Sequence, residues 1–123
     1  MNSFEELEVW KAAREFKNEI SKIVKHFPGE EKFRLVDQII RASRSVTNNI
    51  SEGFGRFHYQ ENIQFCRQAR GSLSETLDHL ICALDEGYID ESIFNKFREK
   101  YNHCLKLLNG YIAYLKKKKQ DNQ

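Results

Sequence analysis

The sequence has one proline, only six glycines in 123 residues, and no long run of apolar side chains. Such a composition is typical of a compact helical protein and unlike that of a disordered chain. No apolar stretch approaches the roughly 20 residues that span a membrane. The N-terminal segment MNSFEELEVW lacks the basic and then apolar regions of a signal peptide. We therefore expect a cytoplasmic protein with no membrane association.

Residue patterns for metal binding are also missing. Three cysteines, Cys66, Cys82 and Cys104, are odd in number and widely spaced, which is typical of reduced thiols in a helical core. Structural zinc is disfavoured because the sequence has no Cys-x-x-Cys pair. Helical bundles that bind two iron ions use Glu-x-x-His pairs, but none of the four histidines follows a carboxylate by three residues. We expect no metal site.

The formal net charge is only +2, but it is unevenly distributed along the chain. Residues 1–31 carry 5 basic and 7 acidic side chains, and residues 32–71 carry 7 and 3. Residues 72–99 carry 2 and 7, and residues 100–123 carry 6 and 1. If this separation persists in space, one face of the protein attracts polyanions.

Apolar side chains recur at steps of three and four residues in four segments, the spacing of one face of an α-helix. The segments run from Leu7 to Phe27, Leu35 to Gly53, Tyr59 to Leu84 and Ile93 to Leu115. Four helices of about 20 to 28 residues with short loops predict an all-α fold, an antiparallel up-down-up-down four-helix bundle. We expect a single domain over residues 1–119 and a frayed C-terminal tail over residues 120–123.

Residues that favour helix ends separate the segments. Ser3 with Glu6 three residues later matches a capping box for the first helix, which Pro28 ends. Gly87 is expected in the left-handed conformation after the third helix, and Asp90 is expected to cap the fourth.

The decapeptide NNISEGFGRF, residues 48–57, raises three interpretations. A phosphate-binding loop needs Gly-Lys-Ser/Thr after a strand, which is absent, and a glycan on Asn49 matters only in a secreted protein. Gly53 and Gly55 are best explained as the end of the second helix, where glycine permits positive φ. We expect Asn49, Glu52 and Arg56 to hold this turn or a subunit contact first, and to touch a ligand second.

A polar stripe runs along the second helix, away from its apolar residues. It consists of Arg34, Asp37, Arg41, Arg44, Asn48 and Glu52. It is a solvated face with internal pairs such as Asp37 with Arg41, a subunit interface, or a phosphate-binding surface. The phosphate contacts would come from Arg41, Arg44, Arg56, Arg67 and Arg70, with Lys116, Lys117, Lys118 and Lys119 as a sequence-independent anchor. Phe57 and Tyr59 offer stacking surfaces for unpaired bases.

Two features of the third helix need an explanation. Ser72, Glu75 and His79 follow helical steps, which favours a polar ladder over a catalytic group. Gly71 lies in mid-helix, where glycine costs about 1 kcal/mol relative to alanine. We expect a close helix–helix approach there, inside the bundle or between subunits.

Several segments resemble a known family. FEELEVWKAA, LVDQIIRASRSVTNNISEGFGR, QFCRQARGSLSE and LDEGYI are similar to the four-helix bundle proteins encoded by intervening sequences in bacterial 23S ribosomal RNA genes. That family also includes the accessory variability protein of diversity-generating retroelements. By resemblance, the signature positions are Arg41, Asn49, Glu52, Gly53, Gly55, Arg56, Gly71 and Glu75.

The resemblance implies a homopentameric ring with no known enzymatic activity and no cofactor. Its implied partners are RNA together with a reverse transcriptase, or ribosomal RNA. Our leading hypothesis is therefore a non-enzymatic, ring-forming protein that binds RNA, or a complex containing it, through arginines and the lysine tail. The alternative is a protein-interaction scaffold that binds no nucleic acid.

Overall fold

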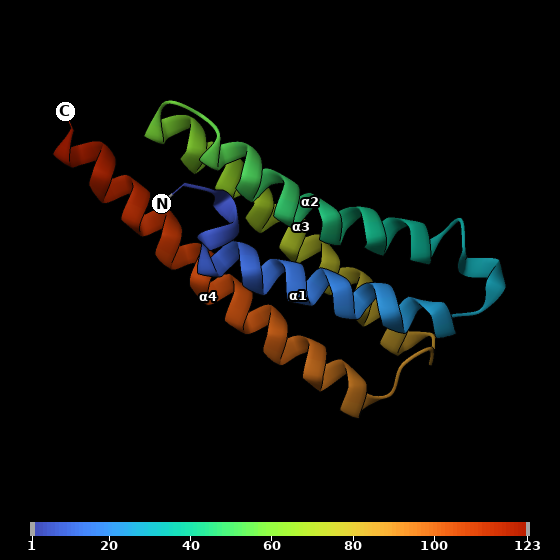
Figure 1. The fold of residues 1–123 in the computed structure, drawn as a ribbon. Coiled ribbons are helices and arrows are strands. Elements are labelled where there is room, and N and C mark those ends of the chain that lie inside the picture. Colours follow the sequence, from blue (N-terminus) through green and yellow to red (C-terminus); the bar gives the residue numbers. More distant parts are fainter. Residues whose placement is uncertain (1, 123) are drawn as a thin grey trace.

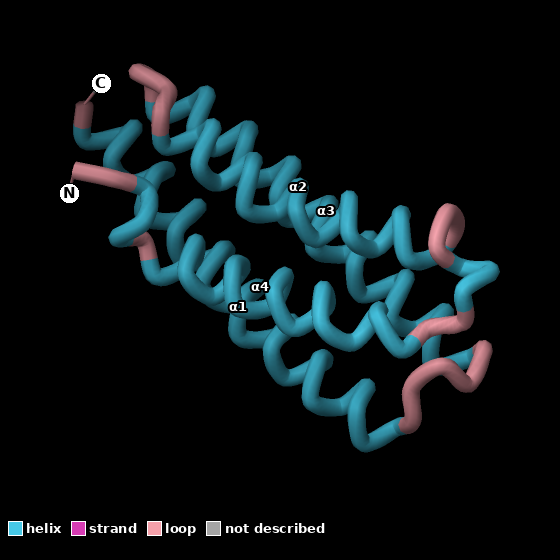
Figure 2. The backbone as a smooth tube through the Cα atoms, turned by 45° about the vertical axis from the view of Figure 1, so that its right-hand side comes forward, coloured by secondary structure: helices cyan, strands magenta, loops and turns pink. Residues whose placement is uncertain are grey.

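Four long helices, each with one apolar face, form an antiparallel bundle in the computed structural model, which describes residues 2–122 (Figure 1). They are α1 (Glu8–Ile23), α2 (Leu35–Phe54), α3 (Tyr59–Asp85) and α4 (Glu91–Asp121). Short 3-10 helices, η1 (Phe4–Glu6), η2 (Val24–His26) and η3 (Gly29–Glu31), precede α1 and follow it. The chain runs up, down, up and down, and the remaining loops lie at the two ends of the bundle (Figure 2). The predicted fold class is confirmed.

The core consists mainly of the apolar stripes that the sequence predicts, but Tyr59, the first residue of the third stripe, is exposed. Fully buried side chains include Phe16 of α1, Ile39 and Ile50 of α2, Leu73 of α3 and Leu108 of α4. Helix α2 packs mainly against α3, α3 also packs against α4, and α1 lies against α2 and α4. Cys66 and Cys104 are buried in this core, but Cys82 is exposed, so its predicted core position is wrong.

The helix ends agree with the sequence in two places and differ in one. Asp90 accepts a 2.9 Å hydrogen bond from the backbone N–H of Ile93, and Gly87 has a φ of 77°, as predicted. Ser3, however, caps the 3-10 helix η1 through the N–H of Glu5. The predicted capping box therefore does not start α1, whose N-cap residue is Leu7.

The glycines of α2 and α3 act differently from the prediction. Gly55 has a right-handed φ of −75°, and Gly87 is the only glycine with positive φ in the described chain, so positive φ does not end α2. Gly53 marks the close helix approach, because a Cβ there would lie 2.6 Å from Asn62 Oδ1 and 2.9 Å from Phe65 Cβ. A Cβ on Gly71 would meet nothing within 4 Å, so the predicted close approach inside the bundle at Gly71 is wrong.

The helices differ greatly in length. Helix α1 has 16 residues and α4 has 31. At a rise of about 1.5 Å per residue, α4 is longer than α1 by roughly 20 Å. The last turns of α4 extend beyond α1 at the end of the bundle where both termini lie (Figure 1). Helix α4 continues to Asp121, so Gln120 and Asp121 are not the frayed tail that was predicted, and Gln123 lies outside the described residues.

None of the helices within residues 2–122 combines the length and the apolar character that a membrane crossing needs.

Candidate nucleic-acid interface

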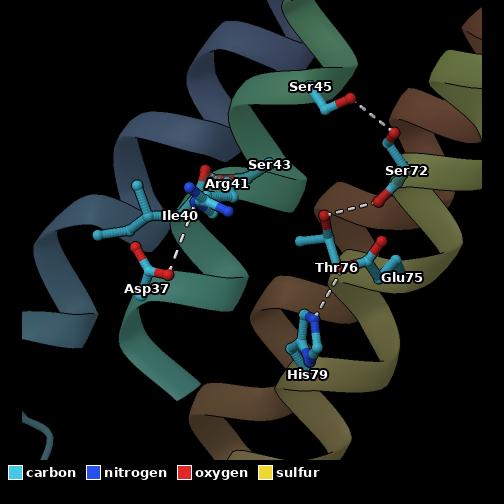
Figure 3. Close-up of polar contacts among 9 residues, drawn as sticks. All are labelled: Asp37, Ile40, Arg41, Ser43, Ser45, Ser72, Glu75, Thr76 and His79. Atoms are coloured by element: carbon cyan, nitrogen blue, oxygen red, sulfur yellow. Dashed lines mark hydrogen bonds and ion pairs between the residues drawn. The ribbon is translucent and has the colours of Figure 1, made fainter. Parts of the chain in front are cut away.

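The predicted phosphate-binding residues fall into two groups in space. Arg41 and Arg44 lie exposed on α2, where Arg41 pairs with Asp37 at 3.6 Å, as the sequence predicted (Figure 3). Arg67 of α3 lies instead beside the C-terminal turns of α4, with Lys116 and Lys119. The folding of two antiparallel helices brings these three cations together, although almost fifty residues separate Arg67 from Lys116 along the chain.

We call this second group the basic pocket. It has a volume of about 320 Å³ and is lined by Gln60, Ile63, Arg67, Lys116, Lys119 and Gln120. Lys119 Nζ donates a 2.6 Å hydrogen bond to Gln60 Oε1, which links the end of α4 to the first turn of α3. No described residue that lines the pocket is acidic, and within residues 2–122 no ion pair involves Arg67, Lys116 or Lys119.

The other predicted cations lie close to this pocket or are already paired. Arg70 donates a 2.9 Å hydrogen bond to Asn109 Oδ1 across α3 and α4. Lys117 and Lys118 are exposed, and the ammonium group of Lys118 lies 5.8 Å from the centre of the Tyr114 ring.

Arg56 holds the turn between α2 and α3. Its guanidinium lies 3.3 Å from Glu52 and 3.9 Å from Glu61, one carboxylate on each side of the turn. It also lies 4.7 Å from the centre of the Phe65 ring. Two carboxylates compensate this charge, so Arg56 is less available to a phosphate than Arg67. Asn49 likewise bonds within its own helix, donating to Ser45 O at 2.9 Å.

Polar side chains of α2 and α3 bond to one another across the two helices and along α3 (Figure 3). Ser72 shares a 2.9 Å hydrogen bond with Ser45 across the two helices, and its carbonyl oxygen accepts from Thr76 at 2.8 Å. His79 bonds to Glu75 at 3.0 Å. The Ser72 hydroxyl is thus bonded to Ser45, and Glu75 and His79 pair along α3, an arrangement typical of a polar ladder. Within residues 2–122 no group of three or more His, Cys, Asp or Glu side chains is placed to hold a metal ion.

A second pocket lies at the same end of the bundle and was only partly anticipated. It has a volume of about 460 Å³, and its aromatic walls are Phe54, Phe57, Tyr59, Tyr111 and Tyr114. We call it the aromatic pocket. In the sequence, Tyr111 belongs to the apolar stripe that runs from Ile93 to Leu115, and Tyr114 lies outside this stripe. The spacing indicates that the two tyrosine rings are neighbours, because Tyr111 and Tyr114 are three residues apart on a helix whose core stripe ends at Leu115.

These features define a class of protein: a small all-α bundle with cations and aromatic side chains gathered at one end. The chain matches the family model of the 23S rRNA-intervening sequence proteins over residues 5–110, and it belongs to that family. The predicted family is therefore confirmed. The match ends before Tyr111, Tyr114 and the four lysines.

A solved structure supports the same fold. It is a protein of unknown function from Bacteroides thetaiotaomicron, described as a member of the S23 ribosomal protein family. The two structures superpose with a TM-score of 0.78 at 24% sequence identity, over 85% of this chain and 95% of that chain. A search of curated proteins gave no match.

Proposed function

We propose that this protein is a non-enzymatic, cytoplasmic RNA-binding protein, and that the basic pocket is its main phosphate contact. The observation that carries the proposal is the convergence of Arg67, Lys116 and Lys119 in one concave site with no acidic side chain among the described residues that line it. Such a site attracts phosphates without regard to sequence. RNA is the polyanion that the family resemblance implies.

The other predicted arginines contribute outside the basic pocket. Arg70 lies one helical turn from Arg67, and Arg41 and Arg44 lie on α2, where one compensating carboxylate, Asp37, pairs with Arg41. We assign them a weaker role than the basic pocket, because a paired or isolated surface cation gains less from a phosphate contact.

Salt dependence tests the proposal. The affinity for RNA is expected to fall steeply with salt, because each phosphate contact releases counterions. Replacing Arg67, Lys116 and Lys119 together with glutamine removes up to three contacts, which lowers the log–log slope by about 2 for a single strand. The matched control replaces three exposed lysines at the opposite end of the bundle, Lys22, Lys25 and Lys32, with glutamine.

The control variant loses the same net charge, so an equal effect of both variants would show a general charge effect and contradict the pocket assignment. The absence of RNA binding at low salt would overturn the function itself. Partners retained after nuclease treatment and high salt would then favour the protein-interaction scaffold.

We also propose that the protein self-associates, as the family resemblance implies, through the outer surface of α2 and α3. This surface carries both signs of charge, with Arg41 and Arg44 on α2 and Glu75 on α3, so a second copy finds complementary groups there. Sedimentation velocity tests this. A pentamer of the 14.6 kDa chain has a mass of five times that value, 73 kDa. A single species at the monomer mass at all concentrations would disprove self-association.

A further inference from the structure

The aromatic pocket is open because of the unequal helix lengths. Its lining includes Leu7, the residue before α1, together with Tyr111, Tyr114 and Leu115 of α4. Helix α1 begins at Glu8 and therefore does not cover the last turns of α4. The bundle thus ends in a pocket between α4 and the turn that joins α2 to α3.

The walls of the pocket differ in rigidity. Asn62 Nδ2 donates a 3.1 Å hydrogen bond to the hydroxyl oxygen of Tyr111, and Asn62 Oδ1 accepts from the Cys66 thiol at 3.5 Å. These bonds fix the half-buried Tyr111 ring. Tyr114 lies nearly parallel to it, with ring centres 6.2 Å apart and an interplanar angle of 13°, yet Tyr114 is 54% exposed. The Tyr111 ring is therefore a fixed wall of the pocket, and the partly exposed Tyr114 ring lies beside it.

Large aromatic groups are exposed around the rim. Phe57, in the turn between α2 and α3, is 93% exposed, and Tyr59 is 37% exposed. Exposed aromatic side chains lack the favourable free energy that comes from removing apolar surface from water. Three exposed aromatics at one pocket indicate a ligand with flat faces.

The charge around the pocket identifies the kind of flat ligand. Arg56 lines the pocket with its charge compensated by Glu52 and Glu61, Lys118 lies near the Tyr114 ring, and no acidic residue is among the described lining residues. The basic pocket shares the same helical turns, since Tyr59 is followed by Gln60 and Leu115 by Lys116. An aromatic surface next to a phosphate-binding surface is the combination that binds single-stranded nucleic acid.

We infer that the aromatic pocket holds an unpaired nucleobase of an RNA strand whose phosphates contact the basic pocket. The inference rests on the proposed function and adds its substrate class: the protein selects single-stranded RNA over duplex RNA. In a duplex the base faces are stacked on one another and are not accessible to Tyr114.

The test compares two exposed aromatics. Tyr114→Ala is expected to weaken binding of a polyuridine of roughly 12 nucleotides by about five-fold or more, the value of one stacked base. The salt slope should not change, because no cation is removed. The control is Phe33→Ala, since Phe33 is 84% exposed near the opposite end of the bundle and should leave affinity unaltered. Circular dichroism confirms that both variants are folded.

Two further probes separate the possible outcomes. An abasic strand of the same length is expected to bind the normal protein and Tyr114→Ala equally, and a duplex is expected to bind more weakly than the single strand. Equal affinity of Tyr114→Ala and the normal protein for polyuridine would overturn the base site while leaving phosphate binding intact. A normal protein that binds none of these strands at low salt would instead disprove the proposed function.

Discussion

Gly53 and Gly71 both lie within helices, yet their surroundings are opposite. A methyl group at Gly53 would overlap Asn62 and Phe65, whereas Gly71 faces open space. We expect Gly53→Ala to lower the free energy of unfolding by about 1–3 kcal/mol, the usual cost of overpacking. Gly71→Ala should raise it by up to about 1 kcal/mol through helix propensity. Urea unfolding measures both.

The same pair of variants tests a remaining alternative for Gly71, namely a close approach between subunits. If that contact exists, Gly71→Ala disturbs the sedimentation profile. A profile identical to that of the unsubstituted protein, combined with a gain in stability, would rule it out.

The cysteines differ in reactivity because their burial differs. Burial raises the pKa of the Cys66 thiol to about 11 and that of Cys104 to about 12. The pKa of the exposed Cys82 is also raised, by partial desolvation and then by the nearby carboxylates of Glu86, Glu31, Asp85 and Asp78. A thiol reagent at pH 8 should therefore modify Cys82 in the native protein, slowly, and the other two only after unfolding. Three fast-reacting thiols in native protein would contradict this burial.

The raised thiol pKa values also predict how stability depends on pH. Folded pKa values above the unfolded value of 9.0 mean that the folded state retains protons that the unfolded state releases. The stability contributed by the neutral thiols is therefore complete below pH 9 and is lost as the pH rises through about 11 to 12. Replacing Cys66 and Cys104 with alanine should flatten the decline of the urea midpoint above pH 9.

At the scale of elements, the two predicted caps have different consequences. Asp90 bonds to the first turn of α4, which has 31 residues, whereas Ser3 bonds to the three-residue helix η1. Asp90→Ala should cost about 1 kcal/mol of unfolding free energy. Ser3→Ala should cost clearly less, because η1 buries no residue. Equal losses in thermal or urea unfolding would show that η1 contributes more to stability than its burial indicates.

At the scale of the whole molecule, the acidic half of α3 and the lysine run of α4 lie at opposite ends of the bundle. Residues 72–95 contain six carboxylates and no lysine or arginine, and they occupy the end where α3 meets α4. Lys116 to Lys119, in the last turns of α4, lie at the opposite end, where Lys116 and Lys119 line the basic pocket with Arg67. Added RNA should therefore slow hydrogen exchange in residues 59–70 and 111–119 and leave residues 78–97 unchanged. Protection centred on residues 78–97 would place the ligand at the acidic end and contradict the proposed interface.

Much of this architecture could be predicted from sequence because it follows from local periodicity. The predicted stripe of α2, from Leu35 to Gly53, is buried, together with Ser43 and Thr47, which the pattern did not include. Asp90 and Gly87 act as their residue types require. The prediction that Ser3 begins the first α-helix was wrong because a capping pattern does not reveal whether a 3-10 turn or an α-helix follows it. Gly53 and Gly71 could not be told apart, because one sequence shows no distance between helices.

The sequence by itself determined the four helices, their apolar faces and the amount of charge in each segment, because these depend on residues a few positions apart. Only the tertiary structure decided which charges gather. It brought Arg67 to Lys116 and Lys119, left Arg41 and Arg44 on another helix, and compensated Arg56 with two carboxylates. It also left the aromatic pocket open, because α4 is longer than α1. Contacts between distant segments depend on how helices pack, which local sequence patterns do not encode.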